Sequence, residues 1–511
     1  MKAQDYNISS EKFKFRSMDD NIHDKKLETK PIGYFKDALY RFTRNKGSIV
    51  AAFIIGFLLL FSLVGPYMTP YKVIDKDPQY VNVLPKNDFF AQFGIWDGTE
   101  KIKGVSSTTK DKLVAIELET GEDVIIGDIE EKETVKGKKT TYEYSYRVDT
   151  YSKVGVVYMP TMSDEEYQAI QKYQLDTGIQ IIYPITDTKL RTTAIAEKTN
   201  ANIWFKTAEK TSLEIVYDEN GNFIPIYKEY TGNDNYNSIR VEGDTPKYDY
   251  AISKQNGTQW EVRVKYSEYY KYIHRNDKID NAEFWFGADA AGRDIFVCLA
   301  SGARFSFVLA IIVAAVNLFV GAIYGAIEGY YGGKLDLFME RIADILGSIP
   351  SMIVITLLKY HLKADPPIIL FISFFLTGWI GMASRTRMQF YRFKNQEYVL
   401  VARTLGARDR RIMFKHIFPN AIGTLITGSV LVIPSVIFSE TSLSYLGIIN
   451  LETGNMTSVG TLLSNGQSSL YTFPHMIIFP ALFISLLMLS FNLFGNGLRD
   501  AFNPSLRGTE E

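Results

Sequence analysis

The residues of this chain best suited to a chemical task lie in a basic stretch, Glu397–Asn420, which reads EYVLVARTLGARDRRIMFKHIFPN. Apolar side chains recur there at i, i+3, i+4 and i+7, so one helical face holds Tyr398, Val401, Ala402 and Leu405. Gly406 can end or bend that helix. An apolar face followed by arginines suits recognition of a protein surface rather than catalysis. An ordinary basic loop would show the same periodicity, so the pattern alone leaves both interpretations open.

No nucleotide-binding loop accompanies this stretch. The segment most similar to such a loop is Lys136–Thr140. A phosphate-binding loop also requires an earlier glycine, and Lys132 stands at that position. We therefore expect no ATP binding and no catalytic residue in this polypeptide. His361 and His416 are isolated in the sequence, so no metal site is expected. The single cysteine, Cys298, excludes an intramolecular disulfide.

Long apolar runs flank the basic stretch. The chain has 511 residues, of which 46% are hydrophobic, and a formal net charge of −1. Its apolar residues concentrate in runs of about 20, enough to cross about 30 Å of hydrocarbon. Six membrane spans are predicted: Ser48–Tyr67, Phe305–Ala326, Ile342–Leu358, Ile368–Ala383, Ile422–Leu446 and Met476–Phe494.

The charges flanking these runs predict the topology. Tyr34–Arg44 is basic and amphipathic, which fits an interfacial helix or, equally, a merely basic flank. Either way the first span starts in the cytoplasm, and six spans return the C-terminus there. The segment Ser384–Asn420 holds nine Arg and Lys residues against two acidic ones, and this topology places it inside the cell. The predicted location is a multi-pass plasma-membrane protein with both termini cytoplasmic.

The region between the first two spans has a different character. Residues 71–290 carry 28 Lys and Arg against 37 Asp and Glu, a net charge of −9. Strands are predicted at Lys112–Glu117, Tyr142–Val148 and Glu261–Lys265, and a hairpin where Asp218–Gly221 separates Leu213–Tyr217 from Phe223–Tyr227. Ser163 and Glu166 form a capping box for a helix that runs to about Tyr173. We expect a folded α+β domain outside the membrane.

These observations divide the chain into six parts. They are a cytoplasmic tail with an interfacial helix (1–47), the first span (48–67), the α+β region (71–283), an entry motif (284–304), the remaining spans (305–497) and a cytoplasmic tail (498–511). The fifth part includes the basic cytoplasmic loop 384–420.

The basic stretch resembles the cytoplasmic loop of ABC-importer permeases, whose motif runs E-A-A, three residues, Gly, nine residues, I-x-L-P. Ala402, Gly406 and Pro419 match at that spacing, whereas Leu400, Val401 and His416 depart from it. The peptide-transporter branch, with Y-V-x-A-A-R-x-L-G-A and H-I-x-P-N, fits better. Its matching residues are Tyr398, Val399, Ala402, Arg403, Leu405, Gly406, Ala407, His416, Ile417, Pro419 and Asn420.

Other segments resemble the C-type subunit of dipeptide, oligopeptide and nickel permeases. Phe286–Asp294 and Gly302–Arg304 are similar to its F-G-T-D-x-x-G-R-D and G-A-R signature, with Ala288 in place of Thr. Further similarities lie at Gly329–Gly333 with Asp336, Arg341, Asp344 and Ile349–Ser351, at Glu440 with Leu443–Gly447, and at Asn492–Asp500 with Pro504 and Arg507. The resemblance covers about 30–70 and 284–507, so the α+β region is expected to be an insertion of roughly 200 residues.

The resemblance implies an α-helical membrane protein with six spans of the type I ABC-importer permease fold, plus the inserted α+β domain. It implies a homologous B-type permease, two ABC ATPases that bind ATP and Mg²⁺, an extracellular peptide-binding lipoprotein, and a peptide cargo crossing the lipid bilayer. No nucleic acid is implied. The ATPase-coupling residues would be Glu397, Tyr398, Val401, Ala402, Arg403, Leu405, Gly406, Ala407, Arg408, His416, Pro419 and Asn420.

Several roles stay open. The entry motif (Gly287, Asp289, Gly292, Arg293, Asp294 and Arg304) suits a cap on the second span better than a substrate site. Glu440, inside a span, either lines the path or pairs with a neighbouring helix, and pairing is favoured. Asp336, Arg341 and Asp344 are read as an interfacial ion network. The insert would dock or gate the lipoprotein or be a decoration, and a surface receptor is the alternative function. The cargo could be an oligopeptide, a dipeptide, a nickel chelate or a signalling peptide.

Overall fold

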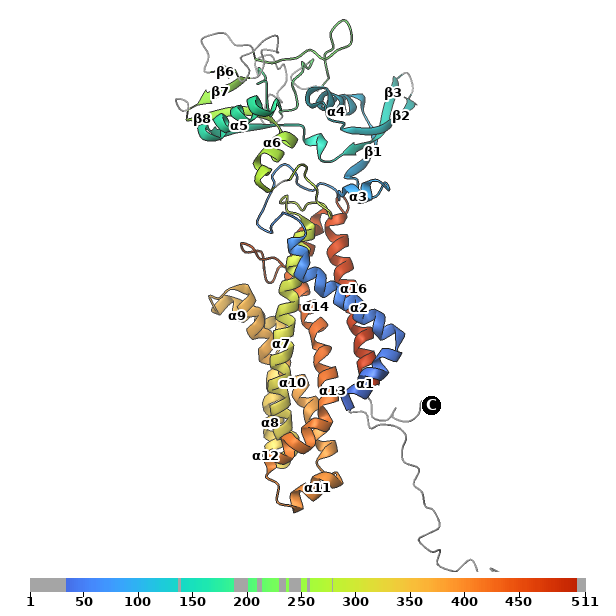
Figure 1. Ribbon diagram of the computed structural model, residues 1–511, viewed down its shortest axis with the longest axis vertical. Helices are drawn as coiled ribbons and strands as arrows, with labels where there is room; N and C mark the ends of the chain where they lie inside the picture. Colours follow the sequence, from blue (N-terminus) through green and yellow to red (C-terminus); the bar gives the residue numbers. More distant parts are fainter. Residues whose placement is uncertain are drawn as a thin grey trace, which may run out of the picture.

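The computed structural model describes residues 34–136, 139–187, 201–208, 214–228, 236–238, 250–254, 258–277 and 279–502. A long helical body carries an α+β domain at one end (Figure 1). The predictions for residues 1–33 and 503–511, for Leu213 and for part of Lys136–Thr140 fall outside the described residues.

The helical body contains five helices long and apolar enough to cross a membrane. The first is α2 (Lys46–Val64, extended to Tyr67 by the 3₁₀ turn η3, Gly65–Tyr67), which follows α1 (Tyr34–Arg44). The others are α7 (Ile295–Tyr331), α10 (Pro366–Phe393), a continuous helix ending in α13 (Phe418–Val430) and α14 (Val432–Tyr445), and α16 (His475–Phe502).

The predicted third span, Ile342–Leu358, is not one straight helix. The chain forms α8 (Gly333–Gly347) and α9 (Ser351–His361), which bend by 72° at the break between them. Pro350 lies in this break, and a proline both lacks a backbone N–H and disfavours helical geometry in the residue before it. The body therefore has six spans if the bent pair counts as one.

Glycines set the closest helix pair in the body. Gly321, Gly325 and Gly329 recur at every fourth residue of α7 and face α10. A Cβ atom on Gly325 would lie 2.0 Å from the Ala383 carbonyl oxygen. Small residues at this spacing let two backbones touch, which is how many membrane helices associate.

The α+β domain holds two sheets. The first has strand order β1-β3-β2, from Thr99–Val105, Lys139–Asp149 and Ile125–Lys136. The second has order β4-β8-β7-β6, from Val156–Ser163, Gln259–Lys265, Tyr250–Lys254 and Tyr236–Ser238, with β5 (Ile182–Tyr183) beside β8. All the pairings are antiparallel. The strands predicted at Tyr142–Val148 and Glu261–Lys265 are confirmed as parts of β3 and β8.

Among the described residues of this domain, three helices have eight or more residues: α4 (Ser107–Thr120), α5 (Asp164–Thr177) and α6 (Tyr266–Ile273). The strand predicted at Lys112–Glu117 is wrong, because these residues belong to α4. Ser106 caps the helix by accepting a hydrogen bond from the Thr109 amide, and Gly121 ends it in the left-handed conformation. The Ser163 cap on α5 is confirmed, since its side chain accepts from the Glu166 amide.

The predicted hairpin turn is present. Tyr217 and Phe223 form an antiparallel bridge, and the Asp218 carboxylate accepts a hydrogen bond from the Asn222 amide at 2.7 Å. The remaining short helical elements are α3 (Asp88–Ala91), η4 (Ser152–Val154), η6 (Arg275–Asp277), α11 (Glu397–Thr404), α12 (Asp409–Arg411), the π-helical turn η7 (Ile412–Ile417), α15 (Val459–Gly466) and η8 (Gln467–Ser469).

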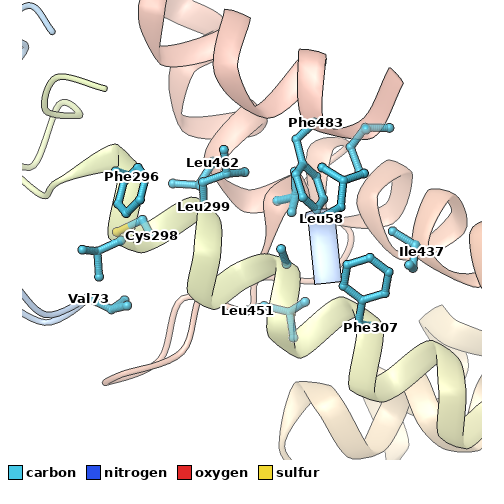
Figure 2. Close-up of a cluster of buried hydrophobic side chains, with 14 of the residues drawn as sticks. Leu58, Val73, Phe296, Cys298, Leu299, Phe307, Ile437, Leu451, Leu462 and Phe483 are labelled. Atoms are coloured by element: carbon cyan, nitrogen blue, oxygen red, sulfur yellow. The ribbon is translucent and has the colours of Figure 1, made fainter. Parts of the chain in front are cut away.

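One buried apolar cluster joins the spans to the base of the α+β domain. It includes Leu58 of α2, Phe307 of α7, Phe483 of α16, and Val73 and Tyr80 from the segment after the first span. Figure 2 shows Leu58, Phe307, Phe483 and Ile437 lying near one another, and Val73 on the side of Cys298. The base of the domain is therefore packed onto the spans and not merely tethered to them.

Candidate functional site: a basic coupling loop and an entry motif

The stretch Glu397–Asn420, called the coupling loop below, begins with the short helix α11. The helix ends at Gly406, whose φ of +80° is the left-handed conformation that glycine adopts without strain. The Gly406 amide donates to the Arg403 carbonyl and the Ala407 amide to the Ala402 carbonyl, which closes the helix end. The predicted helix stop at this glycine is therefore observed.

Two residues of α11 hold it against the body. Val399 is fully buried and Ala402 is 9% exposed. Val399 packs in a cluster with Tyr330, Phe390, Ile412, Met413 and Ile417, from α7, α10 and the π-helical turn. The helical periodicity predicted Ala402 on the same face as Tyr398, Val401 and Leu405. This prediction is wrong, because Ala402 is buried. A helix with apolar residues on more than one side can be oriented in several ways, and tertiary packing here turned Ala402 inward.

The outward surface of α11 remains apolar. Tyr398, Val401 and Leu405 are 40%, 55% and 82% exposed, and Leu400 is also exposed. Nearby, Arg408, Arg410, Arg411, Phe414, Lys415 and Pro419 line an open hollow of about 620 Å³. The coupling loop thus presents an apolar ridge next to a positively charged hollow, which suits a partner with an apolar cleft and acidic rim.

Polar contacts tie the loop to the spans. The Tyr330 hydroxyl, at the end of α7, donates to the Asp409 carboxylate at 2.6 Å, and the Arg403 guanidinium lies 5.9 Å from the centre of the Tyr330 ring. The Asn420 side-chain amide donates to the His416 carbonyl at 2.9 Å and to the Tyr398 hydroxyl at 3.3 Å. Sequence reasoning missed Tyr330 and Asp409, because nothing in their spacing links residues so far apart in the chain.

A charged network close to this end contains Asp336, one of the three residues predicted for it, but not Arg341 or Asp344. Arg387 of α10 is bonded to Asp336 at 2.6 and 2.9 Å and to Glu340 at 2.6 and 3.0 Å. Arg341 and Asp344 pair with each other at the surface and take no part in this network. The spacing of Asp336 and Glu340, four residues apart on one helix face, is the signal that could have pointed to a basic partner on another helix.

The entry motif forms a clamp at the opposite end. The Asp289 carboxylate accepts from the Ala291 and Arg293 amides and from Arg293 Nε at 2.8 Å, and Arg293 Nη1 reaches Glu452 at 2.7 Å. Asp294 caps α7 by accepting from the Phe296 amide at 2.8 Å, as the capping interpretation predicts. The burial of Asp294 raises the pKa of its carboxyl to about 7.

The glycines of the motif permit close backbone approach. A Cβ on Gly292 (φ +72°) would lie 1.8 Å from the Asp77 carbonyl oxygen, and one on Gly287 (φ +79°) would lie 2.6 Å from the Val83 carbonyl oxygen. Arg304 Nη1 donates to the Tyr67 hydroxyl at 3.1 Å. These contacts fasten α7 to the segment after the first span, which supports a structural interpretation of the motif.

Glu440 lies between helices. Its carboxylate is fully buried and accepts from the Ser306 hydroxyl of α7 at 2.8 Å and the Ser444 hydroxyl of its own helix at 3.1 Å. This geometry favours helix pairing over lining a path. Among the described residues no group of three His, Cys, Asp or Glu side chains could hold a metal ion.

Two family models match the chain. Residues 318–508 match the binding-protein-dependent transport system inner membrane component, and residues 33–85 match the N-terminal transmembrane domain of oligopeptide transport permease C. Among solved structures, inward-facing MetNI methionine ABC transporter chains are similar, and one such match covers 40% of this chain and 96% of that chain at 13% identity with a TM-score of 0.33.

Curated relatives agree with these models. The chain is 44% identical over 231 residues to the oligopeptide transport system permease protein OppC of Bacillus subtilis, covering 45% of this chain and 75% of the relative. It is 38% identical over 229 residues to the dipeptide transport system permease protein DppC of the same organism, covering 44% and 70%. It is 40% identical over 223 residues to OppC of Haemophilus influenzae, covering 44% and 71%.

The predicted fold class is confirmed as a helical membrane protein of the binding-protein-dependent permease family with an α+β region. The relatives are transport subunits and not enzymes. The chain belongs to the family of binding-protein-dependent ABC-importer permeases, in the group that contains the oligopeptide and dipeptide permeases.

Proposed function

We propose that this permease imports peptides with a second, homologous permease and two cytoplasmic ATPases, and that the coupling loop is where it receives force from ATP hydrolysis. The observation that carries the proposal is the form of the loop: an exposed apolar ridge of Tyr398, Val401 and Leu405 on a helix fixed to the spans through Val399. ATP and Mg²⁺ would be bound by the ATPases. The peptide cargo is proposed because the relatives are peptide permeases.

The contacts around α11 allow it to transmit displacement. Val399 belongs to a buried cluster that includes residues of both α7 and α10, and Asp409 is hydrogen-bonded to Tyr330 of α7. A rigid-body shift of α11 therefore moves the ends of two spans together. The π-helical turn Ile412–Ile417 leads directly into α13, so the fifth span shares the same fixed end. Closure of an ATPase dimer would in this way change the tilt of several helices.

The positive charges next to α11 indicate a partner surface that carries negative charge. Arg408, Arg410, Arg411 and Lys415 surround the hollow beside the ridge. An acidic rim on the ATPase would steer the encounter and set orientation, while its apolar cleft would hold Leu405. Following the positive-inside rule, we place this basic surface and both termini in the cytoplasm. The α+β domain then lies outside the cell.

The position of the α+β domain supports a role in receiving the cargo. Its base adjoins the entry motif, since the Asp77 amide donates to the Gly292 carbonyl and the Ala288 amide to the Val83 carbonyl. A loaded lipoprotein approaching the spans from outside would meet this domain. We therefore propose that the domain extends the docking surface or covers the mouth of the path.

Replacing Leu405 tests the coupling role. Because its side chain is 82% exposed, Leu405→Asp should leave the fold intact while placing a charge in the ATPase cleft. We expect loss of peptide uptake and loss of ATPase co-purification in mild detergent. Leu118→Asp is the matched control, since Leu118 is 63% exposed on α4 of the α+β domain. Retained uptake and co-purification in Leu405→Asp would contradict the proposal. A surface receptor would show no such ATPase partner at all.

Removing the α+β domain tests docking. The Lys86 amide donates to the Phe284 carbonyl at 2.9 Å, so the chain enters and leaves the domain at adjacent points. Residues 87–282 can therefore be replaced by a short Gly-Ser linker without stretching the chain. We expect weaker binding of the lipoprotein and slower uptake. Unchanged lipoprotein affinity and uptake would reject docking and leave the domain as a decoration.

A further inference from the structure

A group of large apolar side chains lies exposed at the base of the α+β domain. The segment Asp88–Trp96, which reads DFFAQFGIW and is called the apolar finger below, contains α3. Phe89, Phe93 and Ile95 are 63%, 68% and 57% exposed, and Phe90 is exposed as well. A contiguous patch of this kind is uncommon on a protein surface that faces water, and it usually marks a binding surface.

Hydrogen bonds at Asn87, just before the finger, hold it in place. The Asn87 side-chain oxygen accepts from the Phe89 and Phe90 amides at 3.1 and 3.3 Å, and the Asn87 amide donates to the Trp96 carbonyl at 2.9 Å. Gly94 and Trp96 both have positive φ, +73° and +54°. A bulky residue in this conformation is a strained backbone position that the surroundings must enforce. The phenylalanines are therefore presented outward by a defined loop.

The finger touches the first turns of a membrane span. The Trp96 ring lies edge-on to Phe286 and Phe479, with centroid separations of 5.9 and 5.8 Å, and Phe286 stacks on Phe479 at 4.1 Å. Phe479 is in the second turn of α16. Its neighbours on the helix, Ile478 and Leu482, are each 53% exposed, as expected of side chains that face lipid. Figure 1 likewise draws α3 beside the domain end of α16.

This position makes one occupant fit better than the others. The finger lies beside the first turns of the candidate span α16, and its exposed apolar side chains adjoin the exposed apolar side chains of that helix. Aromatic side chains favour the headgroup region of a bilayer, where Trp and Phe act as interfacial anchors. The finger carries one charged residue, Asp88, at its first position, and no charged residue from Phe89 to Trp96. A docking protein would more often be met by polar groups around an apolar centre.

We propose that the apolar finger inserts Phe89, Phe93 and Ile95 into the headgroup region of the bilayer leaflet on the side of the α+β domain. The domain would then rest on the membrane at a second point besides its packing on the spans. Its height and tilt above the membrane would be fixed by lipid.

Site-specific fluorescence in lipid vesicles tests this proposal. In a Cys298→Ala background, Phe93→Cys is labelled with a polarity-sensitive fluorophore and the full chain is reconstituted in phosphatidylcholine vesicles. Leu118→Cys is the matched control, since it is similarly exposed but lies on α4. At position 93 we expect quenching by lipids spin-labelled near the headgroup, a blue-shifted emission and protection from iodide. None of these is expected at the control position 118. Phe89→Cys serves as a second labelled position in case one variant folds poorly.

Labels at positions 89 and 93 that are open to iodide and unaffected by spin-labelled lipid would overturn the proposal. Protection from iodide without quenching by lipid would also overturn it, since it would mean that protein covers the finger.

Discussion

The α7–α10 helix pair and the β8 region of the α+β domain bring distant segments together by opposite means. In the helix pair, Gly321, Gly325 and Gly329 remove side chains so that backbone lies on backbone. In the domain, the fully buried Arg263 on β8 fills the space between segments. It is bonded to the Glu119 carboxylate at 2.7 and 2.9 Å and to the carbonyl oxygens of Pro184 and Ala201.

The solvent around each region explains the difference. Water drives large side chains of the domain inward, as in the stacked pair of Tyr167 and Trp260, whose centroids are 4.1 Å apart. Lipid tails provide no such drive between helices, so the spans depend on close packing and on a few buried hydrogen bonds. The helix pair should therefore be most sensitive to added atoms, and the domain to removed ones.

Adding one methyl group to α7 should have the most widespread effect, because it disturbs the packing of the spans. In Gly325→Ala the new Cβ would meet the Ala383 carbonyl at 2.0 Å, and because both atoms belong to backbone-fixed positions the helices must separate. We expect a loss of about 3 kcal/mol of stability and little folded protein. Thermal unfolding in detergent measures this. Gly381→Ala, on α10, is the control because no atom lies within 4 Å of its Cβ position. Equal stability of the two variants would contradict close backbone packing.

Removing a buried charge should cost at least as much stability, but its effect should be confined to the α+β domain. Arg263→Met leaves Glu119 buried without its cationic partner, which should cost about 3–5 kcal/mol. Limited proteolysis should then cut the domain while the spans stay intact. The double variant Arg263→Met with Glu119→Leu should recover part of the loss, because no unpaired charge stays buried although the Pro184 and Ala201 carbonyls lose their donor. If the single and double variants are cut equally fast, the ion pair is not what holds these segments.

The smallest effect should appear at the junction of the two regions. Burial, together with a hydrogen bond to Asp88, raises the pKa of Glu283 to about 7. The folded protein therefore binds this proton more tightly than the unfolded chain. The resulting stability is complete below the ordinary carboxyl pKa and is lost as the pH rises through about 7.

The unfolding temperature in detergent should accordingly fall by a few degrees between pH 5 and pH 8. Glu283→Gln should weaken this dependence, since its amide cannot lose a proton, and the remainder is expected from Asp294, whose carboxyl pKa is also raised to about 7. An unaltered pH profile in Glu283→Gln would show that another group is responsible.

The sequence predicted the helical regions better than their interruptions. Apolar runs identify spans because hydrocarbon demands about 20 apolar residues, whatever the neighbours are. The break at Pro350 was missed because the run Ile342–Leu358 stays apolar across it. In the α+β domain, Lys112–Glu117 alternates like a strand, but the Ser106 cap before it and the Gly121 stop after it make it part of α4.

The candidate sites show the same limit. Motif spacing located the coupling loop and the Asp294 cap, since both depend on residues close together in the chain. Motif spacing could not predict that Ala402 is buried, or that Tyr330 and Arg387 take part in these contacts, because the partners come from other helices. Local patterns predict local geometry, whereas contacts between spans depend on the assembled fold.

The length of α7 has a mechanical consequence. Its 37 residues extend about 55 Å, well beyond the roughly 30 Å of hydrocarbon. One end is capped by Asp294 beside the entry motif, and the other holds Asp409 through Tyr330. A single stiff rod thus reaches both surfaces of the membrane. If α7 moves as a rigid body, a displacement of one end also displaces the other. A conformational change could then cross the bilayer through this one helix.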